Sequence, residues 1–349
     1  RLRRSALKFY EIIVKPLSGL GTPLKGDTLF GHVCWQARYD SMLLNGGLDK
    51  WIAAYGERPF AVFSSAWPKL WIEGKAFYAL KRPDLPLSLL FPAADKNRKI
   101  RMADRKEEEK KKWLLVGEDL CIDLKAAEYK SESDLTLLAF GALTDETRRV
   151  MRGRDIKQLL MTSNQPHNTI DRETQTTGEG MFAPFSMPAT YFYPELELAV
   201  FVLIDEEATD IEKVRSALEA IGARGFGRDA STGLGRFDLG DGDEINVPSL
   251  EGADACYTLA PAVPQKGLFH DSSFTPFTRF GRHGDVLAVS AAPFKNPVIM
   301  ADEGAVFVPG DMAVFDKPYL GSAVCNLSKS DPRTVAQGYA PYLPLKLEA

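Results

Sequence analysis

The sequence has 349 residues, of which 45% are hydrophobic and 26% are charged, a composition typical of globular proteins. This length is enough for two domains that each bury a core of their own. No run approaches 18 consecutive apolar residues, and residues 1–8 lack the apolar segment of a signal peptide. We therefore expect a cytoplasmic protein with no membrane partner.

The charges and the cysteines narrow the range of functions. With 43 basic and 47 acidic residues, the net charge is −4, so a nucleic-acid surface would have to be a local patch. Cys34, Cys121, Cys256 and Cys325 are far apart and show no CxxC spacing, which favours buried thiols over a zinc site or a disulfide framework. The sequence predicts neither a cofactor nor a metal site.

The first elements along the chain predict the start of a βαβ unit. Residues 7–14 are rich in aromatic and β-branched side chains and predict a strand. A turn with three glycines follows at 18–26, and the apolar spacing over 28–37 predicts a helix with Asp27 as its N-cap.

The second half of the chain repeats this order. Residues 196–204 form a nearly continuous apolar run of strand length, and the spacing from Thr209 to Glu212 resembles a capping box. The helix that follows should end near Gly222, taken as a left-handed C-cap. We therefore expect tandem α+β domains over residues 1–150 and 151–349.

Two further regions differ in composition from their surroundings. Residues 95–112 carry nine basic and five acidic side chains, which favours a solvated insertion over a segment that contacts phosphates. From Glu251 onward, short apolar runs alternate with Pro and Gly, and this pattern predicts irregular β structure.

The strongest local signal is the Gly-rich loop, residues 225–236, which packs four glycines, two arginines and two hydroxyl side chains into twelve residues. Glycines permit positive φ and close backbone approach, while Arg, Ser and Thr donate to phosphates. The loop follows a helix and precedes a strand, the reverse of a P-loop or dinucleotide fingerprint. Its candidate RNA-binding residues are Gly225, Gly227, Arg228, Ser231, Thr232, Gly233, Gly235 and Arg236, although a tight structural turn is an equally good interpretation.

A second polar stretch runs from His167 to Phe182. His167, Arg172, Thr174 and Thr176 could donate hydrogen bonds to RNA phosphates or 2′-hydroxyls. Composition alone favours an ordinary polar loop whose hydroxyls bond their own backbone.

The ordered set of motifs resembles the RAMP superfamily, and within it the fourth subunit of the Csm-type (type III-A) CRISPR complex. The motifs are the Gly19–Gly31 segment, the stretch from His167 through Ile170-Asp171-Arg172 to Met181-Phe182, the Gly-rich loop, Gly281–Gly284, Lys295–Val298, Glu303–Phe307 and Gln337–Tyr339. The resemblance spans nearly the whole chain.

The resemblance implies tandem ferredoxin-like (RRM-like) domains and a non-catalytic, RNA-binding role in antiviral defence. Such a subunit holds the 5′ handle of the CRISPR RNA beside the large signalling subunit and the backbone RAMP subunits. On the same grounds Lys25, in the N-terminal motif, joins the candidate RNA-binding residues. Asp229 departs from the pattern, because relatives are often more basic at this position.

The alternative is a RAMP endoribonuclease that processes CRISPR repeat RNA. Metal-free cleavage would need a general acid or base such as His32 or His167, and no second base accompanies either residue in sequence. Asp241, Asp243 and Glu244 fit a solvated turn better than a metal site. A third class, a carbohydrate- or protein-binding module, predicts no salt-dependent affinity for RNA.

Overall fold

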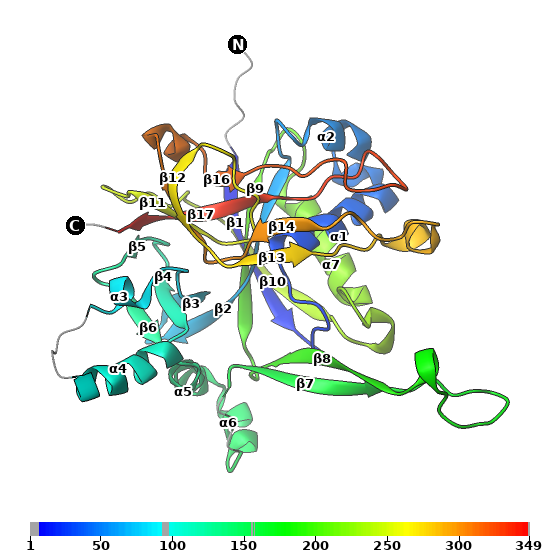
Figure 1. Cartoon of the computed structure of the whole chain (residues 1–349), viewed down its shortest axis with the longest axis horizontal. Helices are drawn as coiled ribbons and strands as arrows, with labels where there is room; N and C mark the ends of the chain where they lie inside the picture. The colour runs from blue at the N-terminus through cyan, green and yellow to red at the C-terminus, as the bar shows by residue number, and fades with distance from the viewer. Residues whose placement is uncertain (1–6, 93–97, 155, 157, 348–349) are drawn as a thin grey trace.

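The structure is a computed structural model that describes residues 7–92, 98–154, 156 and 158–347 (Figure 1). Lys96 and the other residues 95–97 of the basic insertion lie outside the described residues. No helix in the described part of the chain is long and apolar enough to cross a membrane.

The centre of the fold is a seven-stranded sheet with strand order β10-β1-β9-β2-β3-β4-β6. Its strands are β1 (Lys8–Pro16), β2 (Ala61–Ile72), β3 (Lys75–Lys81), β4 (Trp113–Gly117), β6 (Glu128–Lys130), β9 (Glu197–Ile204) and β10 (Phe237–Ile245). Helices α1 (Gly26–Tyr39) and α7 (Ile211–Arg224) pack against each other and against this sheet. The strands expected at 7–14 and 196–204 are thus confirmed, and so is the first helix.

One ferredoxin-like arrangement is assembled from both halves of the chain. The order β1-α1-β2 followed by β9-α7-β10 is that of a βαββαβ unit, and β1 pairs antiparallel with both β9 and β10. The expected division at residue 150 therefore does not separate two sheets. The reason is that β9 is apolar along nearly its whole length and therefore lies inside a sheet with a strand on each side. Its two neighbours are β1 and β2, which both come from the first half of the chain.

A long insertion lies between β3 and β9. It contains α3 (Leu87–Leu90), α4 (Arg98–Lys110), β5 (Ile122–Asp123), α5 (Glu132–Ala142), α6 (Asp145–Met151), β7 (Leu160–His167), η2 (Gly180–Phe182) and β8 (Phe185–Phe192). β7 and β8 pair antiparallel along their whole length and form a hairpin that projects from the body of the molecule (Figure 1).

The C-terminal part is rich in β structure. A second sheet has the order β12-β15-β11-β17-β16, with β5 beside β17, and β13 pairs with β14 in a separate hairpin. The strands are β11 (Ala255–Thr258), β12 (Phe269–Ser273), β13 (Pro276–Arg279), β14 (Val298–Ala301), β15 (Val306–Pro309), β16 (Tyr319–Gly321) and β17 (Tyr339–Lys346). Between residues 246 and 347 the only helices are the 3-10 turns η4 (Asp285–Val289) and η5 (Met312–Asp316), so a second ferredoxin-like unit is not confirmed.

Gln337 joins the two sheets at a bulge in β2. The register of β2 against β9 shifts between Phe63 and Ala66, and the buried Gln337 amide accepts from Phe63 N at 2.9 Å and donates to Phe63 O at 2.7 Å. A Cβ on Gly26 would overlap this same carbonyl. The amide thus satisfies backbone groups that the bulge leaves without a strand partner.

Three expected helix caps are wrong. The N-cap of α7 is Asp210, whose carboxylate accepts from Lys213 N at 2.9 Å, while Thr209 Oγ1 donates to Leu43 O at 2.7 Å, so residues 209–212 form no capping box.

Helix α1 begins at Gly26 and has Lys25 as its N-cap, while the Asp27 carboxylate accepts two hydrogen bonds from Arg279, at 2.6 and 2.9 Å. Gly222 lies inside α7, where a Cβ would overlap Phe237. Its absence of a side chain permits close packing of helix on strand, and the C-cap is Gly225, with φ of 101°.

Candidate nucleic-acid interface

The Gly-rich loop is tied to the segment 18–22 that precedes α1. Gly235 N donates to Gly19 O at 2.8 Å, and Arg236 N donates to Ser18 Oγ at 2.9 Å. Arg228 N donates to Thr22 Oγ1 at 3.0 Å. Two of the sequence motifs, more than 200 residues apart, thus form one unit.

The four glycines of the loop serve different purposes. A Cβ on Gly225, Gly227 or Gly235 would overlap neighbouring protein atoms, whereas a Cβ on Gly233 would meet open space. All four have positive φ. The N–H groups of Gly225, Gly233 and Gly235 already donate to backbone carbonyls. In this conformation those N–H groups are not free for a phosphate. Close packing against neighbouring atoms supports a structural role for Gly225, Gly227 and Gly235, but not for Gly233.

The two arginines of the loop also have partners within the protein. Arg228 donates through Nε to Asp229 Oδ2 at 3.2 Å and through Nη2 to Pro188 O on the hairpin. Arg236 donates through Nη1 to Ala223 O near the end of α7, at 3.0 Å, and remains exposed. Arg236 is thus the more accessible guanidinium.

The hydroxyl side chains lie on the outer turn of the loop. Ser231 and Thr232 belong to η3 (Ala230–Thr232), and both are exposed. Thr232 Oγ1 donates to Asp229 O at 2.9 Å. Together with the open position at Gly233, these residues form an accessible polar edge beside Arg236.

The hairpin reaches the loop through His167 and the start of its other strand. The His167 ring stacks on Phe185, with centroids 5.1 Å apart, and its Nε2 lies 3.8 Å from Asp229 Oδ2. The base of the hairpin is fixed by Leu20, which exchanges backbone hydrogen bonds with Thr190. The His167 motif and the Gly-rich loop therefore converge in space.

Arg172 and Thr174 lie farther out. Both are exposed in the turn beyond β7, where Thr174 and Thr176 share a hydrogen bond between their hydroxyls at 2.9 Å. This loop forms the far end of the projecting hairpin in Figure 1. The structure thus separates Arg172 and Thr174 from His167, although sequence grouped them.

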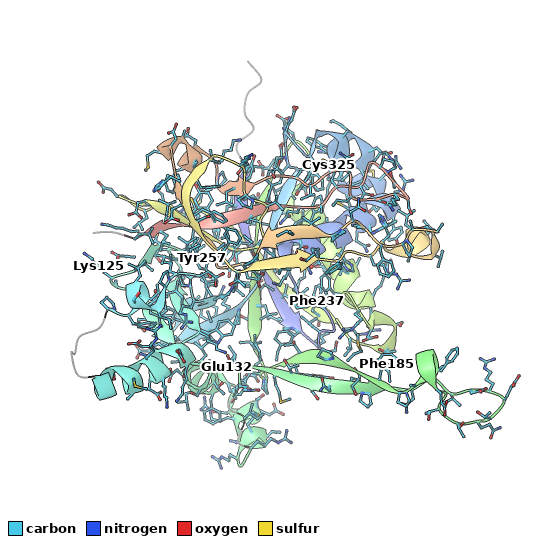
Figure 2. The ribbon with its side chains drawn as sticks, in the orientation of Figure 1. Lys125, Glu132, Phe185, Phe237, Tyr257 and Cys325 are labelled. Atoms are coloured by element: carbon cyan, nitrogen blue, oxygen red, sulfur yellow. The ribbon has the colours of Figure 1, made fainter. Side chains whose placement is uncertain are left out.

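Aromatic side chains on the hairpin were not among the predicted site residues. Phe182 and Phe185 are half exposed, and Figure 2 shows Phe185 on the hairpin, outside the body of the protein. Bases of single-stranded RNA stack on such rings. The sequence signal that could have identified these rings is the apolar pair Met181-Phe182 at the end of a polar stretch.

Lys25 has a different environment from the one the resemblance implied. Its ammonium pairs with Asp302 and with Glu303 Oε2, the latter at 3.0 Å, and its side chain is largely buried. Burial lowers the pKa of Lys25, but the two carboxylates outweigh it and the net pKa is raised. A phosphate would have to displace these carboxylates to reach the ammonium.

Two other histidines, His32 and His283, are held by contacts within the protein. His32 packs against Phe226, with ring centroids 4.4 Å apart, and burial lowers its pKa to about 4. His283 Nε2 shares a hydrogen bond with Ser328 Oγ at 2.7 Å. Within the described residues, no group of three His, Cys, Asp or Glu side chains is arranged to hold a metal ion.

The described part of the basic insertion, residues 98–112, consists of α4 and the two lysines that follow it, and the side chains of residues 102–107 are exposed. Its charges are partly paired along the helix, Lys110 with Glu107 at 2.7 Å and Arg105 with Glu109 at 3.9 Å. Such exposed pairs are typical of a solvated helix face.

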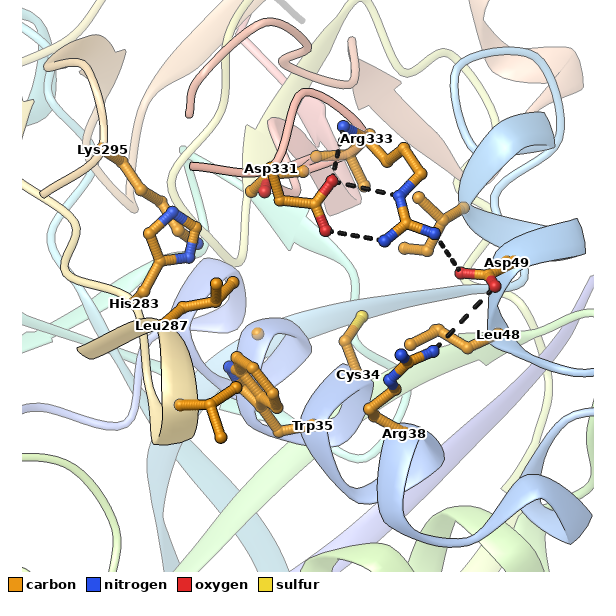
Figure 3. A pocket seen from close by; sticks show the side chains of 15 residues that line it. Cys34, Trp35, Arg38, Leu48, Asp49, His283, Leu287, Lys295, Asp331 and Arg333 are labelled. Carbon is orange, nitrogen blue, oxygen red and sulfur yellow. Dashed lines mark hydrogen bonds and ion pairs between the residues drawn. The ribbon is translucent and has the colours of Figure 1, made fainter. Parts of the chain in front are cut away.

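A separate cavity of about 310 Å³ lies between α1, α2 (Leu48–Ala54) and the loops around His283 and Arg333 (Figure 3). Arg333 closes one side through Asp331 at 2.9 Å and Asp49 at 3.2 Å. Burial raises the pKa of the Cys34 thiol to about 12, so this cysteine stays protonated at neutral pH. None of the predicted RNA-binding residues lines this cavity.

Comparison with known proteins places the fold. No protein-family model and no curated protein matches the sequence. The chain is similar to one in a crystal structure of a Csm3–Csm4 subcomplex of the type III-A CRISPR–Cas interference complex, with a TM-score of 0.53 and 11% identity over 96% of this chain and 99% of that chain. It is also similar to one in a Csm1–Csm4 cassette in complex with cA4, with a TM-score of 0.51 and 17% identity over 98% and 99% of the two chains.

Csm4 is the component that these two assemblies share. The chain therefore shares a fold with a component of these assemblies, in agreement with the resemblance of its sequence motifs to the Csm4-type subunit.

Proposed function

Because the chain shares a fold with a component of these assemblies and its motifs resemble the Csm4-type subunit, we propose that it is a non-catalytic subunit of a type III CRISPR effector complex and binds the 5′ handle of the CRISPR RNA. The observation that carries this proposal is the junction of the Gly-rich loop, the segment 18–22 and the base of the hairpin. Three sequence motifs meet there, and exposed donors line its outer edge.

The exposed donors suit a phosphodiester backbone. Arg236 can offer paired N–H donors to a phosphate, and the Ser231 and Thr232 hydroxyls can add single hydrogen bonds. The open space at Gly233 allows the RNA to approach the loop closely. The contact is local, which is compatible with the net charge of −4.

The hairpin extends this surface. Arg172 and Thr174 supply polar contacts at its far end, while Phe182 and Phe185 offer exposed rings. Unpaired bases stack on aromatic side chains regardless of sequence. We assign the hairpin to positioning the RNA, with His167 at the outer end of β7 holding the hairpin against the Gly-rich loop.

Subunit contacts are the second part of the proposal. Exposed apolar side chains gather in the C-terminal segment, on Phe280, Val289, Phe294 and Ile299. Exposed apolar patches mark sites of protein association. We assign this surface to the large signalling subunit or to a backbone RAMP subunit.

We propose no catalytic role. The low pKa of His32 leaves it without a proton to donate at neutral pH. His167 is the remaining candidate of the endoribonuclease alternative, and Asp229 is the ionisable side chain paired with it. A role in orienting the RNA accounts for this geometry, because one face of the His167 ring is covered by the Phe185 ring.

The test is recovery of the protein from its native cells together with its RNA. A binder predicts that guide-length RNA and other effector subunits copurify, and that His167→Ala lowers RNA occupancy but leaves the 5′ end unchanged. Longer, unprocessed RNA in the His167→Ala sample would identify an endoribonuclease instead. Absence of RNA from the wild-type sample would reject the proposal.

A further inference from the structure

A cavity of about 330 Å³ lies between the central sheet and the base of the hairpin. Its volume falls within the range of about 300–1,000 Å³ that is typical of small-molecule pockets. Trp67 on β2, Trp113 on β4 and Phe192 on β8 contribute aromatic walls. Trp67 Nε1 donates to Leu259 O at 3.1 Å and Trp113 Nε1 donates to Glu132 Oε2 at 2.6 Å, so the indole donors are already used.

Among the described residues that line this cavity, two buried side-chain oxygens have no hydrogen-bond partner. Ser65 lines the cavity, is only 4% exposed, and its Oγ has no hydrogen-bond partner among the described residues. A buried hydroxyl without a partner costs about 1–3 kcal/mol. Glu303 also lines the cavity, and its Oε2 is paired by charge with Lys25 but receives no well-directed hydrogen bond.

The charges around the cavity do not favour an anion. Two ammonium groups, of Lys25 and Lys81, face the carboxylates of Asp84, Asp302 and Glu303. Lys81 Nζ also donates to Glu303 O at 3.0 Å. Since these ammonium groups are already neutralised, a neutral planar group fits better than a phosphate.

The cavity adjoins the base of the hairpin. Leu20 and Thr190 both line it, and they are the pair that fixes the hairpin base. The neighbouring Gly19 accepts the hydrogen bond from Gly235 of the Gly-rich loop. RNA bound along the loop and the hairpin would therefore pass beside the cavity.

We infer that this cavity receives one unpaired nucleobase of the bound RNA, an inference that rests on the proposed function. The aromatic walls exclude water from the base. Ser65 Oγ donates to a ring nitrogen or a carbonyl oxygen on the base edge, and Glu303 Oε2 accepts from an adjacent N–H. Every base offers such a donor beside such an acceptor, so the site selects a single-stranded base over a duplex.

The test uses handle-bearing RNAs that each lack one base. Loss of the base that fills the cavity should weaken binding about tenfold, the scale of base–aromatic stacking. Loss of bases elsewhere should have smaller effects. Ser65→Ala should weaken binding of intact RNA about threefold, as expected for one neutral hydrogen bond, but leave the RNA that lacks this base unaffected.

Thr258→Val is the matched control. Thr258 Oγ1 is another buried hydroxyl without a hydrogen-bond partner, and Thr258 does not line the cavity. Neither substitution should lower the melting temperature, because each removes an unsatisfied group. The effect of base removal should shrink in Ser65→Ala and stay at the wild-type value in Thr258→Val.

The outcomes separate this inference from the proposed function. If wild-type protein binds no RNA, the proposed function fails and takes the inference with it. If RNA binds but no single base matters, or if Ser65→Ala and Thr258→Val behave alike, the inference alone is overturned.

Discussion

At the scale of single residues, Gly233 and Gly235 both have a positive φ but differ in their surroundings. Their φ angles are 98° and 77°, so any L residue would strain the chain at either position. A Cβ at Gly235 would also overlap the Phe226 backbone, while one at Gly233 would meet no atom within 4 Å.

Gly233→Ala should therefore cost about 1–2 kcal/mol of unfolding free energy. Gly235→Ala should cost about 1–3 kcal/mol more, because overpacking adds to the backbone strain. Urea unfolding of the two variants measures the difference. Equal losses of stability would mean that the close approach of Gly235 to Phe226 is relaxed in solution.

Glu303 gives a second residue-scale prediction, on pH. Burial raises its pKa to about 7 from an ordinary value of 4.5, against the opposing charge of Lys25. The folded state then holds a proton that the unfolded state has released, so stability is highest below the unfolded pKa and falls as pH rises through about 7. The neighbouring Asp302 has a lowered pKa, so its titration changes the stability only at lower pH.

Glu303→Gln should flatten this loss of stability between about pH 5 and about pH 8. Urea midpoints across that range measure it, with Glu128→Gln, an exposed carboxylate on β6, as the control. The same fall with pH in the Glu303→Gln protein would assign the titration to another group.

At the scale of elements, the projecting hairpin is separable from the core. Its outer residues are exposed, and its attachment includes the Leu20–Thr190 pair, the hydrogen bond from Arg228 of the Gly-rich loop to Pro188 O and the approach of His167 to Asp229. The far end of the hairpin therefore buries little apolar surface.

Replacing residues 169–183 by a short turn should leave the melting temperature nearly unchanged and weaken RNA binding about tenfold or more, because it removes base stacking and phosphate pairing. The control replaces the exposed Arg105, Lys106 and Lys110 of α4 by Gln. If the α4 variant loses affinity and the shortened hairpin does not, the basic insertion is the RNA-binding segment.

Elements with strong local patterns were predictable from the sequence, and contacts between distant segments were not. The apolar run of β9 and the helical spacing of α1 and α7 determine those elements. Asp27 was expected to cap α1, but its carboxylate instead accepts a hydrogen bond from Arg279, which lies 252 residues away in the sequence. The polar stretch at His167 did not predict a hairpin, because its apolar residues do not alternate with polar ones. The hairpin is recognisable only from the pairing of β7 with β8 in the structure.

At the scale of the whole molecule, the central sheet requires both halves of the chain. β1 lies between β9 and β10, and β2 lies between β9 and β3. Two sequence-local units were expected because each half opens with a strand and a helix. The sheet order instead follows from β9, whose side chains are nearly all buried and whose backbone pairs with β1 on one edge and with β2 on the other.

Fragments 1–150 and 151–349 should therefore fail to fold alone and should recover the native circular dichroism spectrum when they are expressed together. The residues of β1 that face β9 and β10 would be exposed in the first fragment. Cooperative unfolding of fragment 1–150 alone would show that the chain does divide near residue 150.

The most direct test of the central claim is the salt dependence of binding to a CRISPR RNA handle, measured by fluorescence anisotropy while RNA length is followed on denaturing gels. For wild-type protein we predict that the logarithm of the affinity falls linearly with the logarithm of the salt concentration. Replacing Arg228 and Arg236 by Ala should reduce the slope by about 0.7 for each phosphate that the protein no longer neutralises. Lys75→Ala, which removes an exposed charge on β3, should leave the slope unchanged. The RNA should keep its length throughout. An unchanged affinity and slope in the double variant, or shortening of the RNA by wild-type protein, would contradict the account.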